Sequence, residues 1–249
     1  MNEPIAPRPE HQWLIRKLES IAALGPEERR AIADLPLTVR QVVRDEIIVR
    51  EGDRPTQCCL LVEGMLYRFK VLPTGARQIL SFHVQGDLPD LQSLHLGVMD
   101  HSLGVVTNSK IAFVSHSAIQ QLIRRYPILG NALWREALID GSIFREWITG
   151  IGRRSSYQRI AHLMCELSLK LQAVGAAGPE GYPFPINQTE LGDALGLSVV
   201  HVNRVLQDLR RDGLIVLKER YLTIPNLDVL METGLFDPSY LHLDHKGGD

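Results

Sequence analysis

The pattern of hydrophobic and polar positions changes along the chain. Between residues 13 and 32, apolar side chains recur at three- and four-residue steps, which predicts short helices. From about residue 37 to residue 114 the pattern breaks into short apolar or alternating runs, separated by turn sequences such as Glu51-Gly52-Asp53 and Gln85-Gly86-Asp87. The runs are Glu46–Val49, Cys59–Val62, Met65–Val71, Ile79–Val84, Leu103–Val106 and Lys110–Val114. Many short strands at this spacing predict a compact β-roll or barrel.

A helical period then returns and dominates the stretch from residue 128 to residue 152. Its apolar stripe is too long for a minor surface helix, so it belongs either to the core or to an interface. We expect a seam against a second copy of the chain, and therefore a homodimer. The residues expected in this seam are Leu133, Ala137, Phe144, Ile148 and Ile151. Gly150 and Gly152 weaken the helix, which places a hinge at residues 150–155.

The most specific pattern begins at Asn187. Glu190 follows three residues later, and the two residues predict a capping box at a helix start. Gly192 lets a second helix cross closely, and Gly196 supplies the left-handed conformation of a sharp turn. Ser198 then predicts the cap of the next helix. A small residue, a turn glycine and a cap at these spacings predict a DNA-binding helix-turn-helix, with a plain helical hairpin as the alternative.

The second helix of this motif ends at Asp212-Gly213 and has a polar outer face. Its N-terminal half would enter the major groove, where Arg204 suits a bidentate bond to guanine. Val199 and Val200 suit contact with a thymine methyl group, although one of them could instead pack on a neighbouring loop. Two short apolar runs around Lys218-Glu219-Arg220 predict a β-hairpin wing with a charged tip. The residues expected to contact DNA are Asn187, Thr189, Ser198, Val199, Val200, His201, Asn203, Arg204, Gln207, Lys218 and Arg220.

Composition adds limits to this picture. The formal net charge is −2, so nucleic-acid binding requires a local basic face. Between residues 153 and 225 there are nine Lys and Arg residues and seven Asp and Glu residues. This segment therefore has a positive net charge, which favours contact with DNA phosphates. Three cysteines without paired spacing, no apolar run of membrane-spanning length and no signal peptide predict a cytoplasmic protein without membrane contact. We also expect a loose arm over residues 1–12 and a frayed tail over residues 242–249.

The order of elements resembles the Crp/Fnr family of bacterial transcription regulators over roughly residues 20 to 230. The resemblance rests on Glu51-Gly52-Asp53, Glu63-Gly64, Gln85-Gly86-Asp87, Gln188–Gly192, Leu195–Ser198, Val202–Leu206 and Asp212–Ile215. It implies a two-domain α+β fold. The parts would be a jelly-roll-like β-roll of the cyclic-nucleotide-binding-domain type over residues 13–127, a long dimerisation helix over 128–152 and a winged helix-turn-helix over 153–230. The implied partners are double-stranded DNA, a second copy of the chain, RNA polymerase and a small-molecule effector of unknown identity.

The resemblance also implies roles for single residues in the DNA-binding domain. Arg204 would be the base-reading arginine, and Asn187, Thr189 and His201 lie where family members touch phosphates. Family members usually carry a glutamate four residues before the arginine, and here that position is Val200. We therefore expect a palindromic operator whose half-site differs from the familiar ones.

A second departure from the family lies in the sensor. Its cyclic-nucleotide binders carry a Gly-Glu pair and, about ten residues later, an Arg-Ser or Arg-Thr pair that hold the ribose and the phosphate. Here the Gly-Glu pair is missing, His101 stands where the arginine would be, and Asp90 and Asp100 add negative charge. Burying an anion without a guanidinium partner is costly, which predicts weak or no cyclic-nucleotide binding. The expected effector pocket comprises Asp90, Leu91, His101 and Ser102.

Other chemistry finds little support. No cysteine precedes Cys58, which excludes the N-terminal iron–sulfur ligands of the oxygen-sensing branch of the family. Neighbouring strand residues point to opposite faces, so we expect one of Cys58 and Cys59 in the core and one at the surface, and Cys165 packed in its helix. Four histidines could gather into a metal or haem pocket, but scattered positions are the expectation: His83, His95, His101 and His116. We predict no metal and no cofactor, and the absence of catalytic motifs predicts no enzyme activity.

The leading hypothesis is a sequence-specific DNA-binding regulator. A second hypothesis is a sensor module that signals through a small ligand, a cyclic nucleotide, a metal or a redox change in the β-roll. A third is a protein-interaction adaptor that has lost DNA binding, which a binding assay on random DNA would separate from the first.

Overall fold

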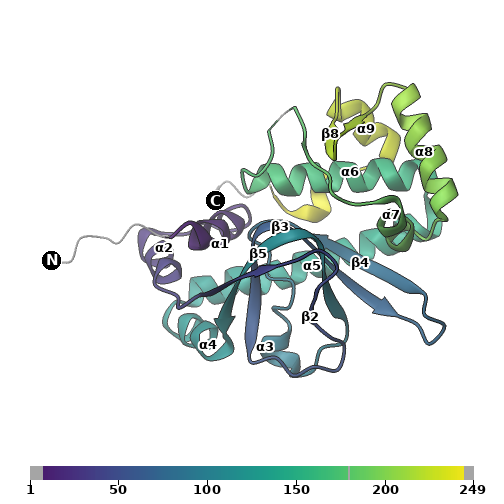
Figure 1. Cartoon of the computed structure of the whole chain (residues 1–249). Helices are drawn as coiled ribbons and strands as arrows, with labels where there is room; N and C mark the ends of the chain where they lie inside the picture. The colour runs from purple at the N-terminus through teal and green to yellow at the C-terminus, as the bar shows by residue number, and fades with distance from the viewer. Residues whose placement is uncertain (1–7, 179, 244–249) are drawn as a thin grey trace. The chain divides into compact units, whose positions relative to one another are not determined.

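A computed structural model describes residues 8–178 and 180–243 of the chain (Figure 1). The chain divides into two compact units. The first unit comprises residues 1–66, 83–138 and 243–249, and the second comprises residues 67–82 and 139–242. Most of the expected arm and tail, residues 1–7 and 244–249, lies outside the described residues. The prediction of a loose arm is wrong for residues 9–12, because Pro9 begins a helix there.

The sensor part of the chain is built around a β-sheet. Its elements are α1 (Pro9–Glu19), α2 (Pro26–Ala33), β1 (Thr38–Val42), β2 (Ile47–Val49), β3 (Gln57–Val71), β4 (Arg77–His83), α3 (Ser93–Leu96), β5 (Ser102–Ser115) and α4 (His116–Arg125). The strand order is β1-β5-β3-β4, and β2 also pairs with β5. β1 runs antiparallel to β5 from the pair Thr38–Phe113 to the pair Val42–Ser109. Their buried side chains include Val42, Cys59, Leu61, Leu66, Leu103 and Ile111, which form one apolar cluster.

β3 and β5 are long strands, and each of them covers two of the short strands that the sequence predicts. Cys59–Val62 and Met65–Val71 are both parts of β3, because Gly64 bends the strand at a φ of 94° instead of reversing it. A side chain at Gly64 would collide with Ser109 on the neighbouring β5. A glycine inside a strand marks a close backbone approach of this kind as readily as a turn. Leu103–Val106 and Lys110–Val114 likewise belong to the single strand β5.

The helix α5 (Pro127–Arg153) links the two units and is 27 residues long. Proline at its first position is favourable, because its missing N–H has no partner in a first turn. The helix continues through Gly150 and Gly152, and Ser155 caps the next helix with an N-terminal capping box to Gln158. The break between the helices therefore falls at residues 154 and 155, at the end of the predicted hinge.

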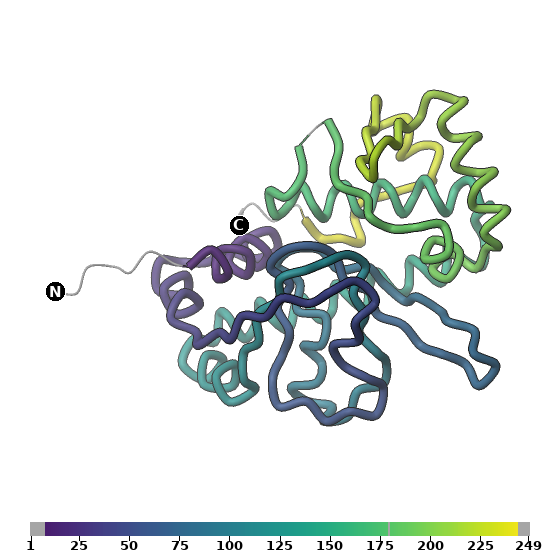
Figure 2. Tube along the Cα trace, viewed as in Figure 1, coloured from purple at the N-terminus to yellow at the C-terminus, as the bar shows by residue number. Residues whose placement is uncertain are grey.

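The second unit is mostly helical. Its elements after α5 are α6 (Ser156–Ala173), β6 (Tyr182–Pro183), α7 (Gln188–Leu195), α8 (Val199–Arg211), β7 (Val216–Lys218), β8 (Tyr221–Thr223), α9 (Leu227–Gly234) and the 3₁₀ helix η1 (Pro238–Leu241). The three short strands form a sheet in the order β6-β8-β7. α6 packs against α7, α8 and α9, and Figure 2 traces these helices from green to yellow. No helix in the described part of the chain has the length and apolarity of a membrane span.

Candidate nucleic-acid interface

Side-chain caps fix the ends of the two helices of the motif. The Asn187 side chain accepts the N–H of Glu190 at 2.8 Å, and the Glu190 carboxylate accepts the N–H of Asn187 at 2.7 Å. This reciprocal pair confirms the predicted capping box. Ser198 accepts the N–H of His201 at 3.3 Å and so caps α8, also as predicted. Each helix therefore starts at the residue that the sequence indicates.

Two glycines set the sharp turn between α7 and α8. Gly196 has φ 67° and ψ 41°, the left-handed conformation that glycine adopts at low cost. Gly192 lies against the turn, and a Cβ placed on it would come 2.5 Å from the carbonyl oxygen of Leu197. A larger residue at 192 would therefore force α7 away from the turn. Both glycines act as the sequence predicts.

The α8 helix has one buried face and one exposed face. Its buried residues are Val202, Val205, Leu206 and Leu209. Arg204 and Gln207 are exposed, Val199 is 45% exposed and Val200 is 81% exposed. Val200 and Arg204 are one helical turn apart, so they lie on the same face. An apolar and a cationic side chain thus project together from the N-terminal half of α8.

Three other polar residues of α8, His201, Asn203 and Gln207, form hydrogen bonds. The Asn203 amide donates to Gln188 on α7 at 3.2 Å and accepts from Gln207 at 2.9 Å. His201 shares a 2.7 Å hydrogen bond with Ser156 on α6. Arg204, in contrast, makes no hydrogen bond or ion pair with any residue that the structure describes. Its exposed guanidinium is therefore available to a ligand.

The predicted wing is present as a two-residue hairpin. β7 and β8 pair from Val216–Thr223 to Lys218–Tyr221, and Glu219 and Arg220 form the turn. Both turn residues have positive φ, 51° and 60°, as a type I′ turn requires. Lys218 and Arg220 are exposed at this tip, and Asn187 and Thr189 are exposed at the start of α7. The residues expected at DNA are therefore accessible in this unit, except that His201 and Asn203 are only half-exposed.

The expected effector residues lie in the first unit and are engaged with their neighbours. Asp90 is fully buried and accepts the N–H of Cys59 at 2.7 Å. Leu91 and His101 are buried, and His101 bonds to Asp100 at 2.8 Å and to Gln92 at 3.2 Å. Ser102 accepts the N–H of Glu51 at 3.0 Å. The position of the expected arginine thus holds an imidazole between a carboxylate and an amide.

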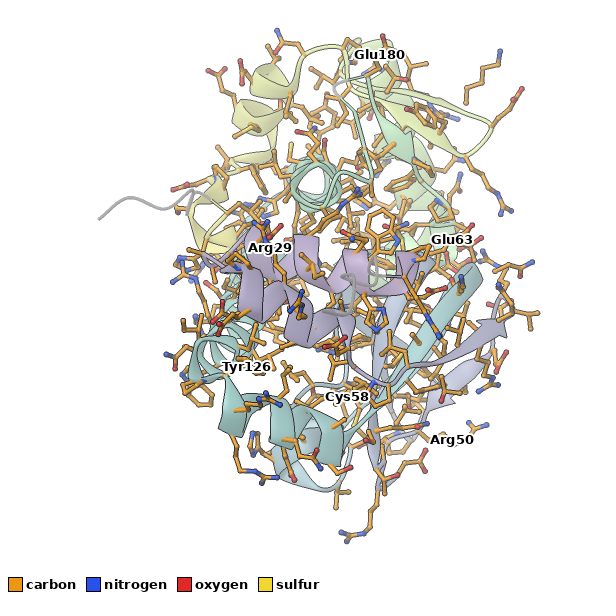
Figure 3. The ribbon with its side chains drawn as sticks, turned by 90° about the vertical axis from the view of Figure 1, so that its left-hand side faces the viewer. Arg29, Arg50, Cys58, Glu63, Tyr126 and Glu180 are labelled. Carbon is orange, nitrogen blue, oxygen red and sulfur yellow. The ribbon has the colours of Figure 1, made fainter. Side chains whose placement is uncertain are left out.

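The prediction that one of Cys58 and Cys59 lies at the surface is wrong. Both are fully buried, as Figure 3 shows for Cys58 among the side chains of its unit. The strand is covered on both faces, because the 90–93 segment packs over Cys58, whose sulfur lies 3.9 Å from the Ser93 hydroxyl. Burial raises the pKa of the Cys58 and Cys59 thiols, and it raises the pKa of Cys165 to about 12. All three are therefore unreactive thiols at neutral pH.

The histidines of the sensor do not form a metal centre. His83 bonds to Asp87 at 3.3 Å, and His116 bonds to Ser93 at 3.0 Å. Within the described residues, no group of three or more His, Cys, Asp or Glu side chains is arranged to hold a metal ion. His95 is exposed on α3.

Exposure along α5 changes the expected seam. Leu133 is 5% exposed and packs in the core of its own unit, so its assignment to an interface is corrected. Ile148 is 72% exposed and Ile151 40%, whereas Phe144 is half-buried. Sequence reasoning missed Trp134 and Leu138, which are 65% and 55% exposed. With Gly141, Arg145 and Ile148, these two recur at alternating four- and three-residue steps, the spacing of a coiled-coil seam.

Two models of protein families match the chain. A cyclic nucleotide-binding domain matches residues 39–126, and a Crp-like helix-turn-helix domain matches residues 158–233. The chain belongs to the Crp/Fnr family. It is a transcription regulator with a sensor domain of the cyclic-nucleotide-binding type and a helix-turn-helix DNA-binding domain.

Known proteins resemble this Crp/Fnr regulator over most of their length. It is 24% identical over 184 residues to a probable transcriptional activator of Rhizobium leguminosarum bv. viciae, covering 74% of this chain and 75% of that protein. It is 22% identical over 195 residues to the fumarate and nitrate reduction regulatory protein of Escherichia coli K12, covering 78% and 77%. The structure of FixK2 from Bradyrhizobium japonicum has a TM-score of 0.71 at 22% identity, covering 80% of this chain and 98% of that chain, and so shares its fold.

The regulator carries a contact that the sequence did not indicate. The hairpin formed by residues 67–82 packs within the DNA-binding unit. Arg77 pairs with Asp193 on α7 at 2.8 Å, and Gln78 donates to the carbonyl of Ala194 at 3.2 Å. Lys170 on α6 donates to the carbonyl of Phe82 at 2.9 Å. Single charged residues of this kind on a strand look like ordinary surface residues in a sequence.

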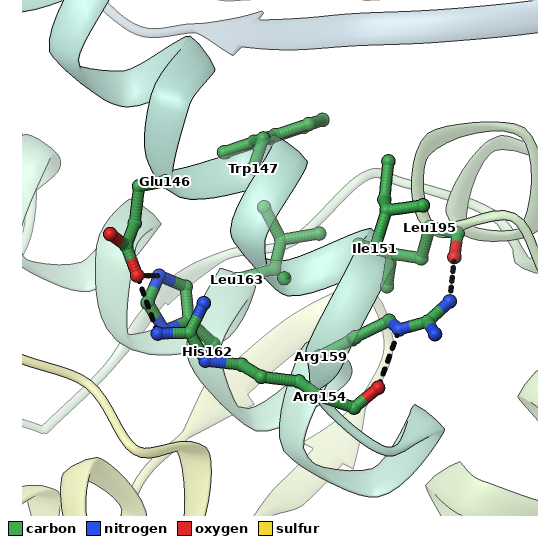
Figure 4. A pocket seen from close by; sticks show the side chains of 9 residues that line it. Glu146, Trp147, Ile151, Arg154, Arg159, His162, Leu163 and Leu195 are labelled. Carbon is green, nitrogen blue, oxygen red and sulfur yellow. Dashed lines mark hydrogen bonds and ion pairs between the residues drawn. The ribbon is translucent and has the colours of Figure 1, made fainter.

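A second feature missed from the sequence lies where α5, α6 and α7 meet (Figure 4). A cavity of about 20 Å³ is lined there by Arg159 and His162, among other residues. Arg159 donates to the carbonyls of Arg154 and Leu195, each at 2.9 Å, and so ties the end of α5 to the end of α7. Beside it, Arg154 pairs with Glu146. Charge-assisted hydrogen bonds therefore hold the end of α5 and the end of α7 against α6.

Buried polar groups continue this network toward the C-terminus. The Trp147 indole donates to Glu166 at 3.1 Å, and the Tyr240 hydroxyl donates to the same carboxylate at 2.8 Å. Burial raises the pKa of Glu166. His162 bonds to Tyr240 at 3.0 Å and stacks on its ring. Burial, and next the charge of Arg154, lowers the pKa of His162 to about 4.

The stability of the DNA-binding unit should fall in mild acid because of His162. Its pKa is lowered on folding from 6.5 to about 4, so the unfolded chain binds more protons between these two values. Stability is full above pH 6.5 and falls as the pH drops through this window, by about 2 kcal/mol at pH 5. Urea unfolding at pH 7 and pH 5 measures the loss. His162→Gln should remove most of it, and an unchanged loss in that variant would contradict the assignment.

Proposed function

We propose that this regulator acts as a homodimer that places two α8 helices about one DNA turn apart on a palindromic operator. The observation that carries the proposal is the exposed face of α8, where Val200 and Arg204 project together from the N-terminal half. The caps and the glycine turn fix this helix on α7 and α6. The unpaired guanidinium suits guanine O6 and N7, and the valine suits a thymine methyl group.

Selection of bound DNA from a random pool tests this proposal. The expected product is a two-fold symmetric site with half-site centres about 34–36 Å apart and a guanine in each half. The half-site should differ from those read by family members that carry glutamate at the position of Val200. Recovery of unrelated sequences with no symmetry would overturn the proposal and favour a protein-interaction adaptor.

Arg204→Ala should weaken binding to the selected site by roughly 1–3 kcal/mol, which is about 5- to 150-fold. The loss should be much smaller on a site in which that guanine is replaced. Fluorescence anisotropy with both duplexes measures the two losses. Lys218→Ala at the wing is the matched control, because a phosphate contact should be lost equally on both duplexes and should reduce the salt dependence. Equal losses on the two duplexes for Arg204→Ala would show that it touches only phosphate.

The sensor should bind cyclic AMP with a Kd weaker than about 100 µM, because no guanidinium stands at the phosphate position. His101 there is already bonded to Asp100 and Gln92, and Asp90 places a buried carboxylate nearby. Isothermal titration calorimetry on the full-length protein measures the affinity. A nanomolar or low-micromolar Kd would contradict this prediction.

We assign residues 13–127 to the sensor domain, 128–152 to the dimerisation helix and 153–230 to the winged helix-turn-helix. The matched ranges of the two family models, 39–126 and 158–233, support the first and the last of these. We further propose that the protein acts on transcription through contact with RNA polymerase and not through catalysis. A small-molecule effector would bias the sensor between two states.

A further inference from the structure

The segment of residues 234–242 follows directly after the part of the chain that the Crp-like helix-turn-helix model matches. At its start, Gly234 lies so close to α6 that a Cβ on it would come 2.7 Å from the backbone nitrogen of His162. Phe236 and Leu241 are buried, with only 7% and 2% of their surface exposed. The 234–242 segment is therefore a packed part of the second unit and not a free extension of α9.

Two aromatic residues of this segment pack on α6. The rings of Phe236 and Tyr240 contact the imidazole of His162, with ring centroids 4.8 Å and 5.8 Å away. The Tyr240 hydroxyl donates to the Glu166 carboxylate at 2.8 Å, and His162 Nε2 lies 3.0 Å from the same hydroxyl. Because Glu166 is only 1% exposed, little water competes for these hydrogen bonds. The segment is thus bound to α6 by contacts that are shielded from solvent.

The same segment is also connected to α5. Arg154, the residue after α5, donates to the carbonyl of Leu235 at 3.1 Å and pairs with Glu146 on α5. The Trp147 indole on α5 donates to Glu166 at 3.1 Å, so α5 and the segment share this carboxylate. The covalent link between α5 and α6 is only two residues long. The 234–242 segment is therefore bonded to both helices at the point where they join.

We propose that the 234–242 segment fixes the angle between α5 and α6 and so determines which spacing of DNA half-sites the regulator accepts. The proposal rests on the proposed homodimer, in which Ile148 of α5 lies at the seam. α6 in turn holds the helix-turn-helix, since Arg159 donates to the carbonyl of Leu195 at the end of α7. The angle between α5 and α6 therefore sets where each α8 lies relative to its seam residue.

The geometry of DNA makes half-site spacing a sensitive measure of this angle. One inserted base pair moves a half-site by about 3.4 Å and rotates it by about 34° around the DNA axis. A fixed joint follows this displacement only by losing contacts to one half-site or by distorting the DNA, and both are costly. A loose joint follows it at lower cost. Loss of the contacts of the segment should therefore relax the spacing requirement and leave base recognition unchanged.

Fluorescence anisotropy with the selected operator, and with the same operator lengthened by one central base pair, tests the proposal. The wild type should bind the longer site at least 100-fold more weakly. A variant that ends at Gly234 should lose less than tenfold, and Tyr240→Phe should show a penalty at least threefold smaller than the wild type. Tyr157→Phe is the matched control and should keep the full penalty. Its hydroxyl also donates to a carboxylate, that of Asp212 at 2.7 Å, but this bond joins α6 to the residue after α8.

The base preference of each variant shows whether its helix-turn-helix is still folded. Replacing the contacted guanine should cost both variants of the segment the same factor in affinity as it costs the wild type. If the shortened chain loses this preference, Tyr240→Phe alone decides, because it removes a single hydroxyl. An unchanged spacing penalty in Tyr240→Phe, or an equal relaxation in Tyr157→Phe, overturns the proposal.

Hydrogen exchange without DNA separates this proposal from that of the homodimer. Amides of residues 150–160 should exchange at least tenfold faster in the variant that ends at Gly234, and those of α8 should exchange at the wild-type rate. Unchanged exchange at residues 150–160 overturns the proposal whatever the DNA result. Equal binding of the wild type to both operators would overturn the proposed homodimer and the role in spacing, whereas faster exchange would still support the segment as the element that fixes the angle.

Discussion

Combined replacement of Leu138 and Ile148 by aspartate should turn the regulator into monomers and weaken operator binding at least a hundredfold. These side chains are 55% and 72% exposed, so neither supports the core of its own chain. In the proposed dimer they lie on the seam of α5, where four carboxylates from two chains would face one another. A dimer gains affinity because its second half-site is bound at high effective concentration, an advantage of about 10²- to 10⁴-fold that monomers lose.

Sedimentation velocity measures the association state, and anisotropy on the selected operator measures the affinity. The expected mass of the variant is the 28.0 kDa of one chain. The matched control combines Val43→Asp with Leu72→Asp, two other exposed apolar positions, which should leave the protein dimeric. A doubled mass for the seam variant would show that copies of the chain associate through another surface.

The DNA-binding motif could be predicted from the sequence because each of its signals is local. Asn187 and Glu190 form a cap within one helical turn, and Gly196 needs only its own backbone to make the turn. Gly192 is needed because it lies against Leu197, only five residues away in the chain. Interactions over such short separations are specified by neighbouring residues, so the pattern of residue types is enough to place them.

The face of α5 could not be predicted because hydrophobicity alone does not distinguish a core from an interface. Leu133 and Leu138 are the same residue type on one helix, yet the first is buried in its unit and the second is exposed. What buries Leu133 comes from elements distant in sequence. The periodic pattern therefore identified the helix, but it counted the buried Leu133 among the interface residues and omitted the exposed Trp134.

The burial of Cys58 and the docking of the 67–82 hairpin escaped prediction for a related reason. The rule of alternating faces assumes a sheet with one face in solvent, and residues 90–93 cover the second face of β3. The pairing of Arg77 with Asp193 joins residues 116 positions apart in the chain. A single sequence contains no signal for such a pair, since either residue alone is typical of a surface.

Lys17→Met should destabilise the first unit by about 3–5 kcal/mol. The Lys17 ammonium is buried and lies 2.9 Å from Asp87 and 3.0 Å from Glu136. Burial lowers its pKa, but the two carboxylates outweigh this and hold the pKa well above its usual range. The ion-pair stability is therefore present below the unfolded-state pKa of about 10.4 and is lost only at still higher pH. Removing the cation leaves two carboxylates beside one another with reduced solvation.

Urea unfolding at pH 7 with and without the substitution measures this loss. Lys110→Met is the matched control, because Lys110 pairs with Glu10 at a more exposed site and should cost less than about 1 kcal/mol. Adding Asp87→Asn and Glu136→Gln to Lys17→Met should restore part of the loss, since the two negative charges that faced Lys17 are then gone. Equal losses in the free energy of unfolding for the two lysine variants would falsify the claim that the buried ion pairs of Lys17 are a main source of stability. Removing the Lys17 ion pairs would then cost the first unit no more stability than removing an exposed pair.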